Sequence, residues 1–191
     1  MKRRYNEIAR ALALAATAHE KQRRKGNGTP YFVHPAEVAM LLIEEDAPQE
    51  VVVAGILHDL LEDTKVTPEE IREGFGDTVL ELVTEVSEVI NPVEKECWEA
   101  RKERSIAKLP QMSRGALLIT CADKLSNLRS IYQDEKFEGL RVWEKFSRGQ
   151  SQQLWYYRNI LDGLKPLEGT GLYGELKRYM DLVFGEHRDD R

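Results

Sequence analysis

Four ionisable side chains stand within six residues at the end of an apolar segment: His58, Asp59, Glu62 and Asp63. The segment before them, residues 51–57, is almost entirely apolar. If the helical periodicity continues, His58 lies over Glu62 and Asp59 lies over Asp63 on adjoining faces. Buried carboxylates need a compensating positive charge, and a metal ion is one, since histidine nitrogen and aspartate oxygen are common ligands. Taken alone, the same residues also fit a solvated helix end at which His58 caps a carbonyl group.

Two more candidate ligands lie elsewhere in the chain. His34 stands directly before a proline, a position that is also typical of a turn or a cap. Asp123 lies inside a long apolar segment, where an unpaired carboxylate is unfavourable. An ion pair with Lys124 or Arg129, or an exposed position, would also satisfy it. Asn127 follows Asp123 by one helical turn, so that it could orient a ligand or donate a hydrogen bond to a phosphate.

Together, two histidines and two aspartates from three helical segments form a candidate metal site: His34, His58, Asp59 and Asp123. Such a set suits one divalent transition metal with open coordination positions. Manganese tolerates both imidazole and carboxylate and is our first choice, and zinc or iron also fits. Water bound to such a metal becomes a nucleophile at neutral pH. Glu62 is then the natural general base or water-orienting group.

The length and composition predict one globular domain that acts on something other than nucleic acid. The chain has 191 residues, of which 41% are hydrophobic and 32% charged, and its net charge is −5. A chain of this length can bury a substantial core. The acidic balance disfavours a broad nucleic-acid-binding surface, although a local basic patch for a phosphorylated ligand is compatible with it.

The cysteines and the N-terminus predict a cytoplasmic protein. Cys97 and Cys121 do not form a C-x-x-C pair, which favours reduced thiols. No segment approaches ~20 consecutive apolar residues, so we expect no membrane span. The basic, alanine-rich N-terminus imitates a signal peptide, but Glu7 and Arg10 interrupt it and apolar residues recur at helical spacing.

Helical periodicity dominates the chain, and alternating strand patterns are nearly absent, so we expect a single compact all-α domain over residues 1–191. The metal site belongs to a core of about residues 8–132, and a helical C-terminal part covers about 136–185. Pro48 opens a helix that runs into the ionisable cluster. We expect further helices at about residues 4–20, 35–45, 94–108, 113–132, 138–147, 149–164 and 172–184.

The chain resembles the HD superfamily of metal-dependent phosphohydrolases. It is most similar to the hydrolase domain of RelA/SpoT enzymes and to the small stand-alone metazoan SpoT homologues, in the strings RRKGNGTPYFVHPAEVA, AGILHDLLEDT and CADKLSNLRSI. The resemblance implies an all-α, usually manganese-dependent hydrolase that removes pyrophosphate from the 3′ position of (p)ppGpp. It implies that the four candidate ligands hold the metal, that Glu62 and Asp63 form the catalytic pair, and that Asn127 is the site asparagine.

The same resemblance implies cationic and tyrosyl contacts to an anionic nucleotide. It places Arg24 and Lys25 near the nucleotide, whereas a solvated basic loop is the alternative. It assigns contacts with distal phosphates to a later region, in which Arg148 and Tyr156 are the candidates. We expect the basic residues of the charged helix, Arg101, Lys102 and Arg104, to form a solvated face.

Three functions remain open from the sequence. The first is hydrolysis of a phosphorylated guanine nucleotide at its 3′-diphosphate. The second keeps the metal site but uses another phosphorylated nucleotide, for example the 2′-phosphate of NADPH. The third is an alarmone-binding module without catalysis. The oligomeric state is not fixed by the sequence, and a homodimer is one state that it allows.

Overall fold

The computed structural model describes residues 2–24, 28–88 and 97–185. Within these residues every regular element is helical, apart from one isolated bridge between Arg23 and Pro30. The α-helices are α1 (Lys2–Ala18), α2 (Val33–Glu44), α3 (Gln49–Leu57), α4 (Leu60–Asp63), α5 (Pro68–Phe75), α6 (Asp77–Val86), α7 (Trp98–Lys108), α8 (Arg114–Glu138), α9 (Gln150–Gly163) and α10 (Gly171–Phe184). Short 3₁₀ turns are η1 (Leu109–Gln111), η2 (Gly139–Lys145) and η3 (Lys165–Leu167). The expected all-α fold is confirmed.

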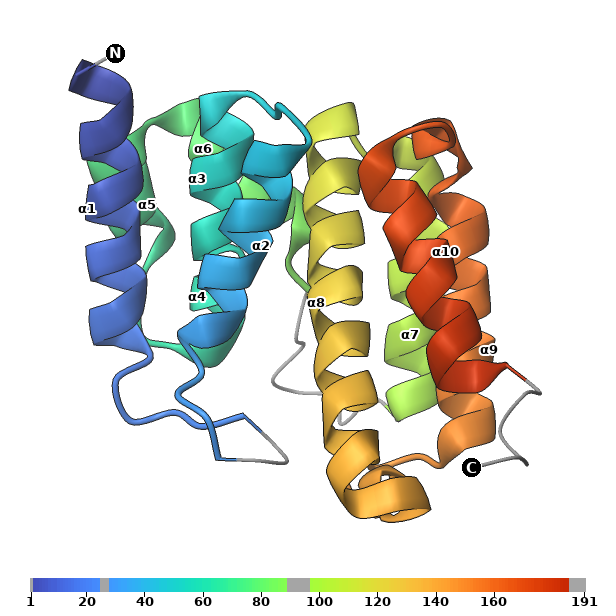
Figure 1. Ribbon diagram of the computed structural model, residues 1–191. Coiled ribbons are helices and arrows are strands. Elements are labelled where there is room, and N and C mark those ends of the chain that lie inside the picture. Colours follow the sequence, from blue (N-terminus) through green and yellow to red (C-terminus); the bar gives the residue numbers. More distant parts are fainter. Residues whose placement is uncertain (1, 25–27, 89–96, 186–191) are drawn as a thin grey trace.

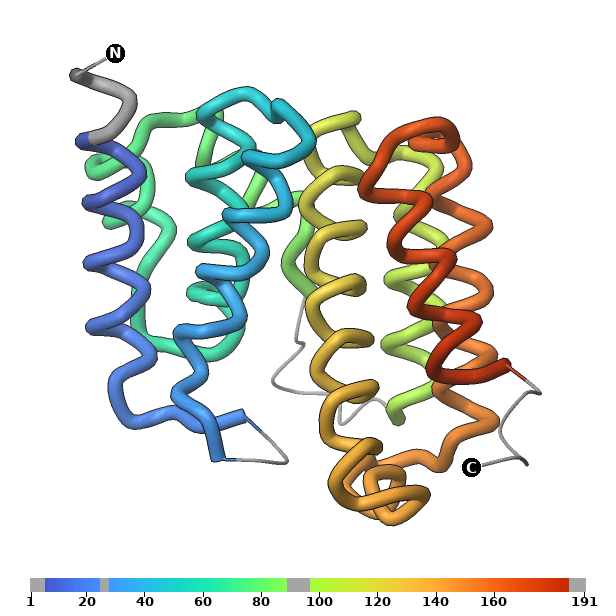
Figure 2. The backbone as a smooth tube through the Cα atoms, in the orientation of Figure 1, coloured from blue at the N-terminus to red at the C-terminus, as the bar shows by residue number. Residues whose placement is uncertain are grey.

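Helix α8 is the central element of the fold. In Figures 1 and 2, α1 to α6 lie on one side of it, and α7, α9 and α10 lie on the other. Most of its first half is buried because it packs against α2, α3 and α6 as well as against α10. Ser113 caps its first turn by accepting a hydrogen bond from the backbone N–H of Ala116 at 3.2 Å.

Several helix ends carry standard capping residues. Thr67 and Glu70 form a reciprocal capping box at the start of α5, with Pro68 in the first turn. Gly76 then adopts a φ of 88°, which ends α5 and directs the chain into α6. None of the described helices is both long and apolar enough to cross a bilayer.

Two predicted helix boundaries differ from the structure. The helix before the ionisable cluster does not continue through it, because α3 ends at Leu57, the chain turns at His58 and Asp59, and α4 begins at Leu60. At this turn His58 Nδ1 lies 2.8 Å from the carbonyl oxygen of Gly55, so that a side chain competes for a helix carbonyl. Helix α8 is also longer than expected and extends to Glu138.

The close approach of α2 and α3, which carry the two candidate histidine ligands at their ends, depends on Gly55. A methyl group at this position would overlap Leu42 Cδ1 and would lie 3.3 Å from Val38 Cγ1. Both neighbours are fully buried, so neither has space into which it can move. The absence of a side chain at Gly55 therefore sets the spacing of these two helices.

We predict that Gly55→Ala destabilises the protein by about 1–3 kcal/mol through overpacking. The matched control is Gly174→Ala in α10, where the added methyl group meets nothing within 4 Å and the residue is exposed. This control should gain about 0.5–1 kcal/mol from helix propensity. Urea unfolding of both variants measures the difference, and equal stabilities would contradict the proposed role of Gly55.

Candidate active site and metal centre

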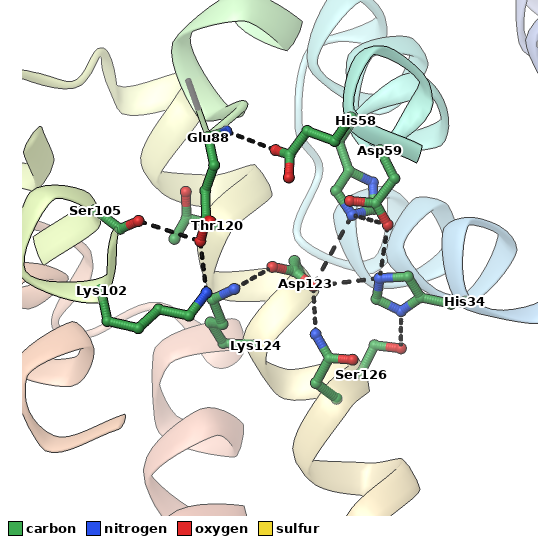
Figure 3. Close-up of polar contacts among 12 residues, drawn as sticks. His34, His58, Asp59, Glu88, Lys102, Ser105, Thr120, Asp123, Lys124 and Ser126 are labelled. Carbon is green, nitrogen blue, oxygen red and sulfur yellow. Dashed lines mark hydrogen bonds and ion pairs between the residues drawn. The ribbon is translucent and has the colours of Figure 1, made fainter. Parts of the chain in front are cut away.

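Four predicted ligands from separate parts of the chain meet in one buried place (Figure 3). His34 lies at the start of α2 and His58 directly after α3, and their side chains are almost completely buried. His58 Nε2 lies 3.1 Å from Asp59 Oδ2, and His34 Nε2 lies 3.2 Å from Asp123 Oδ1 on α8. The crossed distances are 3.6 Å from His34 to Asp59 and 3.9 Å from His58 to Asp123.

The contacts of the two Nδ1 atoms fix the orientation and the tautomer of the two histidine rings. The carbonyl of Gly55 only accepts hydrogen bonds, so the contact with His58 requires a proton on His58 Nδ1. His34 Nδ1 lies 2.8 Å from Ser126 Oγ, and that hydroxyl lies 2.8 Å from Glu37 Oε2. Because Ser126 donates to the carboxylate, it accepts from His34 Nδ1. In neutral rings both Nε2 atoms therefore carry a lone pair directed at the carboxylates.

This donor set fits a divalent cation. Ligand atoms of His34, His58 and Asp59 lie within 4.8 Å of one another, and Asp123 lies beside both histidines. Within the described residues, the buried Nε2 of His58 makes no well-oriented hydrogen bond, although Asp59 Oδ2 lies 3.1 Å away. A buried nitrogen without a partner is unfavourable unless it faces a ligand. Two imidazoles and two carboxylates are the mixed ligands accepted by manganese, iron and zinc.

The pKa shifts in the cluster also favour the binding of a cation. Burial alone would lower the pKa of His58, but Asp59 and Asp123 outweigh burial and raise it to about 9. Burial would raise the pKa of Asp59, whereas His58 and His34 lower it well below its usual range. The two carboxylates thus hold their charge in a buried place and attract a positive one.

Tyr31 supports Asp59 and was not expected from the sequence. Its hydroxyl donates a hydrogen bond of 2.5 Å to Asp59 Oδ2, the oxygen that faces the histidines. Burial and the charge of Asp59 raise the pKa of Tyr31 far above its usual value, which keeps the hydroxyl protonated. Tyr31 belongs to the string that carries His34, so its position three residues before a predicted ligand was the available signal.

The predicted catalytic pair divides into two different environments. Glu62 lines the cavity beside the cluster, and its Oε1 accepts a hydrogen bond of 2.6 Å from the backbone N–H of Glu88. Burial, assisted by the charge of Asp59, raises the pKa of Glu62 to about 7, the range of a general base at neutral pH. Asp63 is exposed as a whole residue and does not line this cavity. Its carboxyl group is partly shielded from water, and this shielding and the charge of Asp59 raise its pKa.

Asn127 and Arg24 form a chain of contacts that ends at the cluster. Asn127 Nδ2 donates to Asp123 Oδ1 at 2.6 Å, and Arg24 Nη2 donates to Asn127 Oδ1 at 3.1 Å. The structure thus brings both predicted residues to the site. Lys25, the second predicted cation of that loop, lies outside the described residues.

The two C-terminal candidates behave differently. Tyr156 is buried and lines the cavity next to the cluster. The guanidinium group of Arg148 instead pairs with Glu99 through contacts of 2.5 and 3.1 Å, and Arg148 does not line this cavity. The structure therefore brings only Tyr156 of this pair to the site.

The cavity has a volume of about 280 Å³ and a cationic wall that the sequence did not reveal. The expectation that the basic residues of the charged helix form a solvated face is wrong for Lys102, because it lines this cavity with Arg101 and Ser105. Lys124 lines it as well, and its ammonium lies 2.6 Å from Asp123 Oδ2. No local signal in the sequence identifies this wall, because Arg101 and Ser105 share one face of α7 whether that face meets water or a cavity.

The chain matches one protein family and several named relatives. The sequence profile described as HD domain matches residues 11–149. The mouse protein named guanosine-3′,5′-bis(diphosphate) 3′-pyrophosphohydrolase MESH1 is 36% identical over 162 residues, which cover 78% of this chain and 88% of that protein. A protein of Aquifex aeolicus with the same enzyme name is 36% identical over 132 residues, and these cover 68% of this chain but 19% of that longer protein.

Two solved structures share the fold. A protein of Listeria monocytogenes EGD-e superimposes with a TM-score of 0.71 at 36% identity, covering 79% of this chain and 98% of that one. A metazoan orthologue of SpoT that hydrolyses ppGpp superimposes with a TM-score of 0.76 at 29% identity, covering 94% and 96%. With the profile match over most of its length, the chain belongs to the HD-domain family.

Proposed function

We propose that this protein is a metal-dependent phosphohydrolase that removes the 3′-diphosphate of a ppGpp-type guanine nucleotide as pyrophosphate. The observation that carries the proposal is the convergence of four ligand side chains beside Glu62, at the wall of a cavity that also holds cationic groups. Relatives that carry the name of this enzyme, at 36–40% identity, support the choice of substrate.

We assign His34, His58, Asp59 and Asp123 as the residues that hold one divalent ion, with manganese as the first choice. Such an ion, when bound, supplies Lewis acidity to a phosphoryl group and makes water more acidic. Ser126 and Gly55 hold the two imidazoles in the orientation that this requires.

The chain's own groups then account for the remaining chemistry. Glu62 takes the proton from the attacking water, since its carboxylate faces the cavity and its pKa lies near neutrality. The new bond joins the water oxygen to the phosphorus next to O3′ and the P–O3′ bond breaks. O3′ takes up one proton, equivalent to the one that Glu62 removed from the water, and the products are GDP and pyrophosphate. Lys102 and Lys124 compensate the negative charge of the diphosphate.

A second cavity supplies space for the nucleoside. It has a volume of about 320 Å³, shares His34 with the first, and is lined by Arg24 and Gln133 among others. Planar guanidinium and amide groups can stack on a base or bind its polar edge.

We also retain the catalytic role for Asp63, the distal-phosphate role for Arg148, and the cytoplasmic location and homodimer as predictions from the sequence.

The function is tested by product analysis. Metal-stripped protein incubated with ppGpp should yield GDP and pyrophosphate only after manganese is added. Release of orthophosphate, or no turnover with metal bound, would contradict the assignment. A parallel panel with NADPH and nucleoside 5′-monophosphates identifies the alternative substrate in that case, and tight ppGpp binding without product would indicate the binding module.

The metal and base roles are separated by two variants. Asp59→Ala should lose turnover and manganese binding together, because it removes a ligand. Glu62→Gln should lose turnover by about 10²-fold or more and still bind manganese. Equilibrium dialysis of manganese beside the product assay measures both. Retained activity in Asp59→Ala would refute the ligand assignment, and loss of manganese in Glu62→Gln would refute the role of Glu62 as a base.

The raised pKa of Glu62 also predicts a pH dependence of stability. In the metal-stripped protein the folded state holds this proton up to about pH 7, whereas the unfolded chain releases it near pH 4.5. The burial of Glu62 therefore lowers the free energy of unfolding progressively from about pH 4.5 to 7, and fully above that. Glu62→Gln should show a gain in Tm that grows over this window. The control Glu81→Gln, on the exposed face of α6, should show no such trend.

A further inference from the structure

Glu88, which follows α6, places a carboxylate on the cationic wall of the cavity (Figure 3). Its Oε1 lies 2.5 Å from Lys102 Nζ and 3.3 Å from Ser105 Oγ, and its Oε2 lies 3.6 Å from Arg101 Nη1. These three partners all belong to α7. One acidic side chain thus engages the hydrogen-bond donors that this helix presents to the cavity.

The two lysines of the cavity are neutralised in different ways. Both ammonium groups lie against the ring of Tyr156, at 4.9 Å for Lys102 and 5.6 Å for Lys124. Lys124 is paired with Asp123, a proposed metal ligand that has to stay in place. Lys102 is paired with Glu88, which has no contact with the ligand cluster through its carboxylate. Of these two pairs, only Lys102–Glu88 can separate without disturbing the metal centre.

We propose that the Glu88 carboxylate occupies the position of a substrate phosphate in the free protein and is displaced by it. The proposal rests on the proposed function, because it needs a phosphorylated substrate in this cavity. The ammonium group of Lys102, the guanidinium group of Arg101 and the hydroxyl group of Ser105 form a set of donors suited to phosphate oxygens. In the free protein, Glu88 satisfies this set and keeps like charges from repelling one another.

The main chain of Glu88 allows this exchange without loss of the catalytic carboxylate. Its backbone N–H holds Glu62 Oε1, whereas its side chain holds α7. The side chain can therefore leave Lys102 and Ser105 while the hydrogen bond to Glu62 remains. The two functions of this residue are carried by different atoms.

Displacement sets a threshold for binding to the α7 donors. The affinity for an anion is the difference between its interaction with the α7 donors and that of the carboxylate it replaces. A diphosphate, which carries more charge and more oxygens than a carboxylate, gains from the exchange. An anion that interacts with these donors more weakly than the carboxylate leaves Glu88 in place.

The test measures equilibrium binding of inorganic pyrophosphate and orthophosphate by calorimetry at a fixed concentration of free manganese. Glu88→Gln should bind pyrophosphate at least about fivefold more tightly than the wild type, the change expected when about 1 kcal/mol of ion pairing is no longer broken. Orthophosphate that binds to the α7 donors should be tightened by the same factor, because the cost of breaking the ion pairs is common to both anions. The control Glu103→Gln removes the same charge from an exposed position of α7 and should match the wild type.

Glu88→Ala gives an independent comparison if the glutamine amide takes over the contacts with α7. If both variants bind pyrophosphate no more tightly than the wild type, or bind it more weakly, the displacement proposal is wrong. Equal tightening in Glu103→Gln would show a general charge effect and would also overturn it. These measurements need no turnover, so their failure is distinguishable from a failure of ppGpp hydrolysis.

Discussion

Two carboxylates lie next to two buried imidazoles between α2, α3 and α8, and ion burial is among the largest unfavourable terms in a folded protein. Neighbouring hydrogen-bond donors offset this cost at both carboxylates. Tyr31 donates to Asp59, while Lys124 and Asn127 donate to Asp123. When both imidazoles are neutral, negative charge is in excess around the two Nε2 atoms, which is the electrostatic reason to expect a cation there in place of the proton that His58 holds in the metal-free protein. The rest of the site is arranged around this charge.

The cavity beside the cluster alternates acidic and basic groups. From the histidine–aspartate cluster outward, Asp123 meets Lys124 and Glu88 meets Lys102, and both ammonium groups lie against the ring of Tyr156. Alternation keeps a strongly charged cavity stable when no substrate is bound. It also explains how a protein with a net charge of −5 can attract a polyanion, because the local cations matter more than the total.

The helices and ligands could be predicted from the sequence because their signals are local. Thr67, Pro68 and Glu70 define a cap within four residues, and the ligands stand out as polar residues in apolar segments. The cationic wall could not be predicted in this way. A lysine such as Lys102 gives the same helical pattern whether it faces water or a cavity, and only its distant neighbours Glu88 and Tyr156 decide which. The break at His58 matches the alternative in which His58 caps a carbonyl group, and the helical pattern alone could not decide for it, since it depends on a side chain bonding to the backbone.

The central position of α8 has a consequence for cohesion. The proposed ligands come from both sides of one packing interface, with His34, His58 and Asp59 on the α2–α4 side and Asp123 on α8. An ion bound by all of these residues would link the two sides of the interface. By thermodynamic linkage, each side would then hold the other in register more firmly when the ion is present. Catalytic activity and the stability of this interface would thus both depend on whether the ion is bound.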